Sequence, residues 1–275
     1  MIISRTPLRI SFFGGGTDYP QWYRTHKGAI LGGTIDKYCY VTLHEGWSSF
    51  TFDLPNKSGL ASSSAYTIGL LRVCSELDKL TIARIATTWE QDKMNGIVGS
   101  QDQYLCSVGG FHKLDFFERG IKDTSVSPNL VKPLEDYLML FDTYQYRQGS
   151  FLIAHQIDNM PHNEPLLTRI AEMPSEGLSL IIKKDYLGFG ALLNEAWMAK
   201  RQLAENVSTP EINAIYDAAM KAGSIGGKLL GGGGGGFIIF FVEPERQQKV
   251  RETLCDLNYV PFHFETEGTK VIYRD

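Results

Sequence analysis

Three loops rich in glycine or serine contain the residues whose types and spacing best suit chemistry. The first loop places Gly14, Gly15 and Gly16 directly before Thr17 and Asp18. Glycines allow a backbone to approach a ligand closely, and the Asp18 carboxylate can accept hydrogen bonds from hydroxyl groups. A tight turn followed by a helix cap at Thr17 or Asp18 would use the same residues. Taken alone, the first loop therefore indicates either a binding site or a turn.

The second loop, residues 53–65, leads into an apolar stretch with helical spacing. Its small side chains leave backbone N–H groups uncovered, and the N-terminus of a helix adds about half a positive charge. This combination predicts a site for phosphate groups, where a serine hydroxyl in the first turn could also bind Mg²⁺. A serine N-cap on an ordinary helix is the alternative. The loop is not a P-loop, because no Gly-Lys-Ser or Gly-Lys-Thr ends it.

The third loop contains Gly226, Gly227 and Lys228, followed after two leucines by six consecutive glycines, Gly231 to Gly236. Ordering a glycine costs roughly 0.5–1 kcal/mol more than ordering an alanine in regular structure. A flexible linker would avoid this cost, but an apolar segment, Phe237 to Val242, follows without any polar spacer. The third loop is therefore predicted to be an ordered binding loop.

The composition excludes several classes of protein. The chain has 275 residues, with 27 Lys plus Arg against 31 Asp plus Glu and a net charge of −4. No basic stripe indicates a nucleic acid or an anionic membrane as partner. No apolar run is long enough to span a bilayer, and the N-terminus lacks the apolar region of a signal peptide. We therefore expect a cytoplasmic, globular enzyme or ligand-binding protein with reduced cysteines, namely Cys39, Cys74, Cys106 and Cys255.

The hydrophobic periodicity predicts an α+β fold, because strands and helices mix without strict alternation. We expect strands over residues 2–13, 28–43, 110–117, 137–142 and 237–242, and a strand-turn-strand unit over 261–273. Helices are expected over 62–80, 82–91, 102–107, 150–159, 185–204, 210–222 and 244–257. A polar stretch at Ser127-Pro128 is the weak boundary signal that separates a domain over residues 1–128 from a second over residues 129–275.

Taken together and in this order, the three loops resemble the motifs of the GHMP kinases. Pro55 to Ser64 match the Pro-x-x-x-Gly-Leu-Gly/Ala-Ser-Ser motif of that family, and Lys228 to Gly236 match its glycine-rich third motif. The first loop matches the galactokinase-like motif through Arg9, Gly14, Thr17, Asp18 and Tyr19. The resemblance covers nearly the whole chain. It implies a two-domain fold with a ribosomal S5 domain 2-like N-terminal domain, which binds ATP, and a ferredoxin-like C-terminal domain.

Within the family, the Gly-Gly-Gly-Thr-Asp-Tyr form resembles sugar kinases that act on D-glycero-D-manno-heptose 7-phosphate. Further similarity to that branch lies at Val98 to Tyr104 and at Leu192 to Trp197 with Lys200. The implied reaction transfers the ATP γ-phosphoryl group to the anomeric hydroxyl, towards GDP-heptose and surface polysaccharide. Fucokinases share much of this pattern, so a non-phosphorylated sugar remains an alternative. An inactive sensor of sugar or nucleotide is a third hypothesis, and the oligomeric state is open, with a homodimer as one option.

The resemblance also implies roles for residues around the phosphates. Asp102 would be the catalytic base, and Arg9 would keep its carboxylate ionised. Ser63 and Glu90 would hold Mg²⁺, with Asp92 as a rival to Glu90. The segment expected to bind the ATP phosphates comprises Ser58, Gly59, Leu60, Ala61, Ser62, Ser63 and Ser64.

The sugar would be bound by residues of all three loops and by cations of the second domain. The first-loop candidates are Gly15, Gly16, Thr17 and Asp18, and those of the third loop are Gly232 and Gly233. The candidate partners of a substrate phosphate are Arg147, Lys200, Arg201 and Lys228. Each of these cations could also be an ordinary solvated charge.

One segment departs from the family pattern. Only Glu45 to Phe52 stands where the family usually has a long segment that contributes to the adenine pocket. Either the protein is truly shorter here or residues are missing from the sequence between Glu45 and Thr51, and we expect the second. No adenine-contacting residue is assigned.

Overall fold

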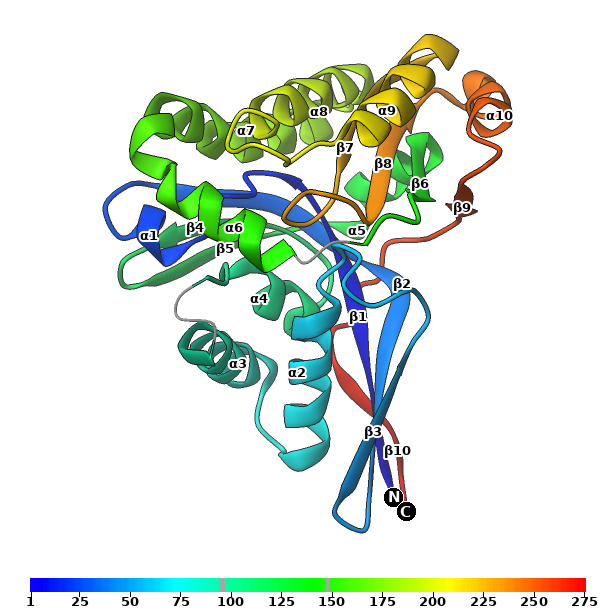
Figure 1. Ribbon diagram of the computed structural model, residues 1–275. Helices are drawn as coiled ribbons and strands as arrows, with labels where there is room; N and C mark the ends of the chain where they lie inside the picture. Colours follow the sequence, from blue (N-terminus) through cyan, green and yellow to red (C-terminus); the bar gives the residue numbers. More distant parts are fainter. Residues whose placement is uncertain (94–96, 147–148) are drawn as a thin grey trace.

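The computed structural model describes residues 1–93, 97–146 and 149–275. Two antiparallel sheets form its framework (Figure 1). The first has the order β10-β1-β2-β4-β5, with β3 paired to β2, and the second has the order β7-β8-β6-β9. Within the described ranges, no helix is both long and apolar enough to cross a membrane.

The first sheet is built on two long neighbouring strands, β1 and β2. Its strands are β1 (Ile2–Phe13), β2 (Gly28–His44), β3 (Trp47–Phe52), β4 (Phe111–Phe117), β5 (Gly120–Val126) and β10 (Lys270–Arg274). Helices α2 and α4 pack on it, with α3 against both. The helices of this part are α1 (Pro20–Tyr23), α2 (Ser62–Cys74), α3 (Lys79–Lys93) and α4 (Gln101–Val108).

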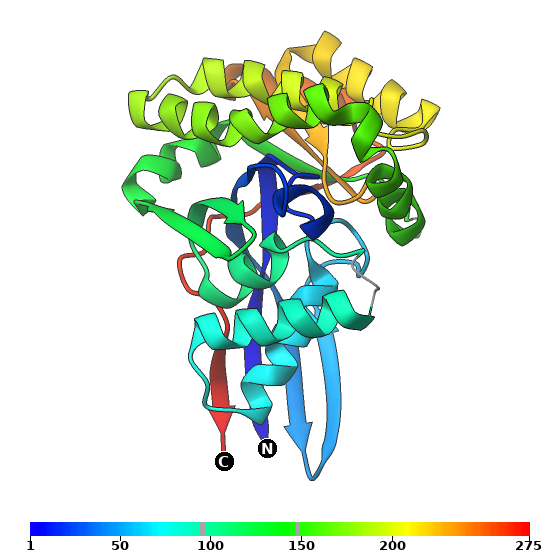
Figure 2. The ribbon, with the colours of Figure 1, turned by 90° about the vertical axis from the view of Figure 1, so that its left-hand side faces the viewer.

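The second sheet is covered by long helices that also reach the first sheet (Figure 2). Its strands are β6 (Leu138–Asp142), β7 (Ser224–Leu229), β8 (Phe237–Val242) and β9 (Asn258–Val260). The helices are α5 (Pro128–Val131), α6 (Gly149–Asp158), α7 (Glu164–Lys183), α8 (Tyr186–Lys200), α9 (Pro210–Ala222) and α10 (Pro244–Thr253), with short 3₁₀ turns η1 (Lys132–Tyr137) and η2 (Met160–Asn163). Because α7 contacts β1, β2 and α8, it joins the two sheets into one body.

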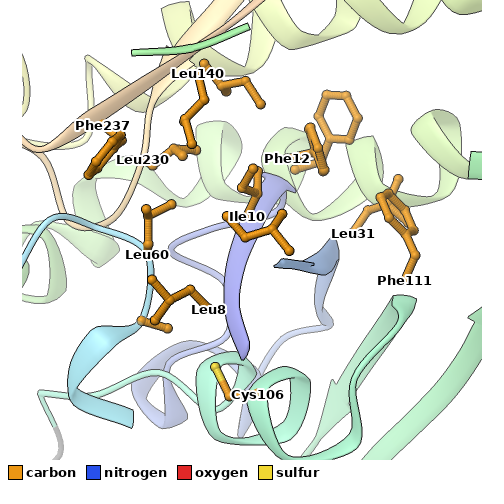
Figure 3. Packing of buried hydrophobic residues seen from close by; sticks show 14 of the residues in the cluster. Leu8, Ile10, Phe12, Leu31, Leu60, Cys106, Phe111, Leu140, Leu230 and Phe237 are labelled. Carbon is orange, nitrogen blue, oxygen red and sulfur yellow. The ribbon is translucent and has the colours of Figure 1, made fainter. Parts of the chain in front are cut away.

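A single hydrophobic cluster runs from the first sheet into the second. Leu8 and Ile10 of β1 lie in the same cluster as Leu60, Leu140 and Phe237, and all five side chains have no exposed surface (Figure 3). The second and third loops pass through this region, at Leu60 and at the residues just before Phe237. The core therefore determines where these loops lie.

The predicted α+β class is confirmed, with differences in particular elements. The expected helix over 62–80 ends at Cys74, and the strand-turn-strand over 261–273 is wrong, because only β10 is a strand there. The sequence reasoning missed β3, β5 and the 20-residue helix α7, which contains Pro174. Strand β10 returns to the first sheet, so the proposed junction at residue 128 does not separate the chain simply, and the two-domain division stays a prediction.

The expectation of missing residues between Glu45 and Thr51 stays a prediction, and in the structure of the printed sequence this segment is a hairpin. Strands β2 and β3 form an uninterrupted ladder from Cys39↔Phe52 to His44↔Trp47. Glu45 and Gly46 alone close the hairpin, with φ of 48° and 83°. Positive φ at both central residues is typical of the tight turn that suits the twist of two antiparallel strands.

Candidate active site

All three loops meet at one cavity of about 770 Å³. The first loop contributes Gly15, Gly16 and Asp18, and the third contributes Lys228, Gly231 and Gly232. The second loop contributes Lys57, Gly59 and Ala61 to Ser64, while α3 and α4 add Glu90 and Asp102. Residues that sequence reasoning predicted from distant positions therefore face one space.

Arg9 and Asp102 form a bidentate ion pair in this cavity. Arg9 donates from Nε to Asp102 Oδ1 at 2.8 Å and from Nη2 to Oδ2 at 2.9 Å. Its third nitrogen, Nη1, donates to the Gly59 carbonyl at 2.8 Å. Burial lowers the pKa of the Arg9 guanidinium, but the charge and hydrogen bonds of Asp102 raise it by more. The pKa of Arg9 is therefore above its ordinary value. Arg9 thus holds the Asp102 carboxylate in place and anchors the second loop beside it.

The N-terminus of α2 is prepared for an anion. Its cap residue is Ala61, whose φ of 64° is left-handed and whose side chain offers no hydrogen bond. A non-glycine residue in this region costs of order 1–3 kcal/mol, which is typical of functional sites. Ser62 points away, since its hydroxyl donates to Asn56 Oδ1 at 2.7 Å, whereas Ser63 is exposed at the cavity. The first turn therefore presents backbone N–H groups without a capping side chain.

The buried carboxylate nearest this turn is Glu90 of α3. Its Oε2 accepts hydrogen bonds from Ser64 Oγ at 2.8 Å and Gln103 Nε2 at 2.5 Å, and the buried Oε1 has no partner in the described part of the chain. Burial raises the pKa of Glu90, and the surrounding donors only partly offset this. A carboxylate with a free buried oxygen fits a cation. The serine that contacts it is Ser64, and the predicted pairing with Ser63 stays a prediction.

Asp18 is held by neutral donors at the other side of Asp102. Its carboxylate accepts from Gln101 Nε2 at 2.9 Å and from the Gly16 N–H at 3.3 Å. Burial raises the pKa of Asp18, and the negative charge of Asp102 raises it further. This carboxylate lines the cavity and can accept hydrogen bonds from ligand hydroxyls.

Lys200 and Lys228 are buried at the cavity and pair with backbone carbonyls. Lys200 donates to the carbonyls of Leu229 and Gly231, and Lys228 donates to that of Phe12 at 2.8 Å. Burial and the charge of Arg9 lower the pKa of Lys200 to about 8. Burial and the charge of Lys200 lower the pKa of Lys228 well below its ordinary value. Among the described ion pairs neither lysine has a carboxylate partner. An anionic ligand beside them would favour their protonated forms and be attracted by them in turn.

The second and third loops touch backbone to backbone. A Cβ on Gly59, whose φ is +86°, would lie 2.5 Å from the Leu230 carbonyl oxygen, and one on Gly231 would lie 2.5 Å from Gly59 Cα. The nearest atom to a Cβ on Gly15 would be Ser11 Oγ, at 4.0 Å. Gly59 and Gly231 allow the two loops to touch, whereas Gly15 leaves room for a ligand.

Several predicted residues lie outside the cavity lining. The Thr17 hydroxyl donates to the carbonyls of Gly14 and Ala29 and so holds the first loop together, and a contact of Thr17 with the sugar stays a prediction. Leu60 is a core residue, the Ser58 carbonyl accepts the Phe237 N–H, and Gly233 packs on Val207. Arg201 does not line the cavity, and Arg147 lies outside the described residues.

Sequence reasoning missed other residues that line the cavity. They are Ser11, Tyr19, Lys57, Trp89, Lys93, Ile97, Val98, Gly99, Gln101, Ile153 and Gln156. Gln101 lies in the segment Val98 to Tyr104, which resembles the heptose-phosphate kinases, and its place directly before Asp102 is the signal that points to it. Trp89 likewise precedes Glu90. It is 52% exposed, which is unusual for so large an apolar side chain.

Comparison with known proteins agrees with this geometry. The model of the GHMP kinases N-terminal domain matches residues 34–110, and that of the GHMP kinases C-terminal region matches residues 178–260. The D-glycero-alpha-D-manno-heptose 7-phosphate kinase of Campylobacter jejuni is 26% identical over 335 aligned positions, with 98% of each chain covered. Since this alignment is longer than the 275-residue chain, the relative has segments without a counterpart here.

Two crystal structures share the fold over nearly the full length. A D-glycero-D-manno-heptose 1-phosphate kinase from Bacteroides thetaiotaomicron has a TM-score of 0.79 at 22% identity, with both chains covered completely. Lactococcus lactis galactokinase complexed with galactose has a TM-score of 0.77 at 16% identity, with 98% of this chain and 94% of that chain covered.

Proposed function

This chain belongs to the GHMP kinases, and we propose that it transfers the γ-phosphoryl group of ATP to the anomeric hydroxyl of D-glycero-D-manno-heptose 7-phosphate. The observation that carries the proposal is the Arg9–Asp102 pair, which faces the same cavity as the uncapped N-terminus of α2. A carboxylate that can orient a hydroxyl and an anion site in one space are what phosphoryl transfer to a hydroxyl needs.

The proposed chemistry assigns one event to each group. The anomeric oxygen forms a bond to the γ-phosphorus while the bond from that phosphorus to the β,γ-bridging oxygen breaks, and its electron pair leaves with ADP. The proton of the hydroxyl passes to Asp102. A positioned base such as Asp102 increases the rate roughly 10²–10⁴-fold. The backbone N–H groups of Ser62, Ser63 and Ser64 hold the phosphates.

Glu90 is the proposed magnesium ligand, together with Ser63 or Ser64. Mg²⁺ would neutralise charge on the ATP phosphates when bound. The described residues contain no group of three or more His, Cys, Asp or Glu that could hold a metal, so the ion would take further ligands from phosphate and water, as it usually does. Ser64→Ala should weaken Mg²⁺–ADP binding more than Ser63→Ala if Ser64 is the ligand. Calorimetric titration distinguishes the two.

The phosphorylated substrate is favoured by Lys200 and Lys228. Both are buried at the cavity and donate to backbone carbonyls, and burial lowers the pKa of each. A bound phosphate would favour their protonated forms and gain two charged hydrogen-bond donors. A neutral sugar such as fucose would give the two amines no anion to bind. The same observation supports the Campylobacter relative's named substrate as the substrate of this chain.

Coupled measurement of ADP release with a panel of sugars and sugar phosphates tests the proposal. Heptose 7-phosphate should give the highest kcat/KM, and its non-phosphorylated form should be much poorer. Preference for fucose would replace the proposed substrate but keep the reaction. Binding without turnover of any panel member would indicate a sensor instead.

A further inference from the structure

Two glutamines flank Asp102 on α4, and each contacts a different carboxylate. Gln101 donates from Nε2 to Asp18 Oδ2, and Gln103 donates from Nε2 to Glu90 Oε2. Residues two apart on a helix are separated by about 200°, so the two amides reach opposite sides of Asp102. Asp102, the residue between the two glutamines, accepts hydrogen bonds from Arg9. Three consecutive residues of one helix thus serve three separate parts of the cavity.

The amide orientation of both glutamines is imposed by the carboxylates. An ionised carboxylate only accepts hydrogen bonds, so each glutamine must present its NH₂ group to it. The consequence is that Gln101 Oε1 and Gln103 Oε1 are buried and have no partner among the described residues. Leaving a buried acceptor unsatisfied costs about 1–3 kcal/mol. A cost incurred twice beside the same aspartate indicates that the two donated bonds have a role beyond stability.

The turn before α4 also clamps Asp18. The Ser100 N–H donates to the Asp18 carbonyl at 2.9 Å, and a Cβ on Gly99 would lie 2.0 Å from Asp18 Oδ2. Residues 99–101 therefore hold the backbone and the carboxylate of Asp18 immediately before Asp102. A sugar bound by Asp18 is in this way fixed relative to the catalytic base.

From these contacts we propose that Gln101 is the positioning residue of Asp18, the carboxylate that binds the sugar hydroxyls. The inference rests on the proposed sugar-kinase function. The neutral amide orients the carboxylate without forming an ion pair that would compete with the sugar. It also supports ionisation, because burial and Asp102 raise the pKa of Asp18 whereas the hydrogen bond from Gln101 lowers it.

The test compares Gln101→Met with Gln103→Met, each of which keeps an unbranched helix-forming side chain and removes the amide. Calorimetry with heptose 7-phosphate alone should show about tenfold weaker binding to Gln101→Met, the loss expected for a hydrogen bond to a charged group. Mg²⁺–ADP binding to this variant should stay within about twofold of wild type. Gln103→Met should show the reverse pattern, since its amide serves Glu90.

A pH series separates positioning from simple packing. In Gln101→Met the loss of sugar-phosphate binding on acidification should begin at higher pH than in wild type, because Asp18 then takes up a proton more readily. The charged and titratable groups that influence Asp18 are Asp102, Tyr19, Arg9, Lys200 and Lys228, and all are unchanged in the variant. In Gln101→Glu the binding should improve on acidification, since a protonated carboxyl can again donate to Asp18.

Two results would overturn the role of Gln101. One is equal binding of heptose 7-phosphate by wild type and Gln101→Met, and the other is an equal loss for both ligands with a lowered Tm. Should Gln101→Met fail to fold, the pH slope of Gln101→Glu decides. A wild-type protein that binds neither heptose 7-phosphate nor any other sugar of the panel would instead refute the proposed function.

Discussion

The charged side chains of the cavity differ in their partners, and this difference agrees with the role proposed for each. Asp102 is paired with the Arg9 guanidinium, whereas the hydrogen-bond donors to the Asp18 carboxylate within the described ranges are neutral. Lys200 and Lys228 donate to carbonyls. The proposed base, Asp102, is the carboxylate that forms an ion pair with a cation of the protein. Asp18, Lys200 and Lys228, which have neutral partners, are the groups proposed to bind the substrate.

Replacing Asp102 by asparagine tests the base directly. Asp102→Asn keeps the shape of the side chain but cannot take a proton, so kcat should fall by at least about 10²-fold. ADP binding should be preserved, since the N-terminus of α2 is untouched. Kinetics and calorimetry on the same preparation check both statements. Near-native turnover would remove Asp102 from this role.

Lys200 predicts a pH dependence of its own. Its pKa of about 8 means that the ammonium group is charged below pH 8 and becomes neutral as the pH rises through that value. The kcat/KM for heptose 7-phosphate should therefore decline above about pH 8, because a neutral amine no longer attracts the phosphate. In Lys200→Met the value should be low throughout and this decline should be absent. A profile of the wild type that stays level to pH 9.5 would contradict the assignment.

At the level of elements, the second and third loops contact each other through their backbones. The second and third loops approach at Gly59 and Gly231, and Arg9 of β1 fastens the second loop through the Gly59 carbonyl. The ATP-phosphate segment is thereby held from both sides, by a strand and by the third loop. The β2–β3 hairpin is also closed by residues of positive φ, Glu45 and Gly46, but it extends away from this contact (Figure 1).

Two glycine-to-alanine variants separate backbone strain from loop contact. Gly46→Ala places a side chain at φ +83° with no atom within 4 Å of the new Cβ, and should cost about 1–2 kcal/mol of stability. Gly59→Ala adds a collision with Leu230 to similar strain and should destabilise more. It should also raise KM for ATP about tenfold, whereas Gly46→Ala leaves KM unchanged. Urea unfolding and initial-rate kinetics measure these effects, and equal behaviour of the variants would count against the loop contact.

For the molecule as a whole, the cavity is a product of both sheets. Strand β1, helices α2 to α4 and the first two loops supply one side, while α6, α8 and the loop after β7 supply the other. Helix α7 and the continuous core hold these parts together. Ligand binding should therefore be visible at side chains that line this common space and not elsewhere.

The four tryptophans allow this to be measured. Trp22 and Trp197 are 2% and 0% exposed, Trp47 is 83% exposed on the β2–β3 hairpin, and only Trp89 lines the cavity. Mg²⁺–ADP should change the tryptophan fluorescence of wild type and of Trp47→Phe. Trp89→Phe should abolish the change while still binding the nucleotide in calorimetry. A signal that survives in Trp89→Phe would place the ligand or a conformational change elsewhere.

Sequence and tertiary structure determined different parts of this protein. The three loops and their glycines could be predicted, because a motif dictates backbone conformation over a few neighbouring residues. The roles of Arg9 and Asp102 are implied only by the resemblance to the GHMP kinases. The contact of Glu90 with Ser64, the amide of Gln101 on Asp18 and the burial of Lys200 could not be predicted. Each of these depends on the angle at which one helix packs against another element, and that angle is set by the whole core. The β2–β3 hairpin is closed locally, by the positive φ of Glu45 and Gly46, but its strands are paired by the register of the whole sheet.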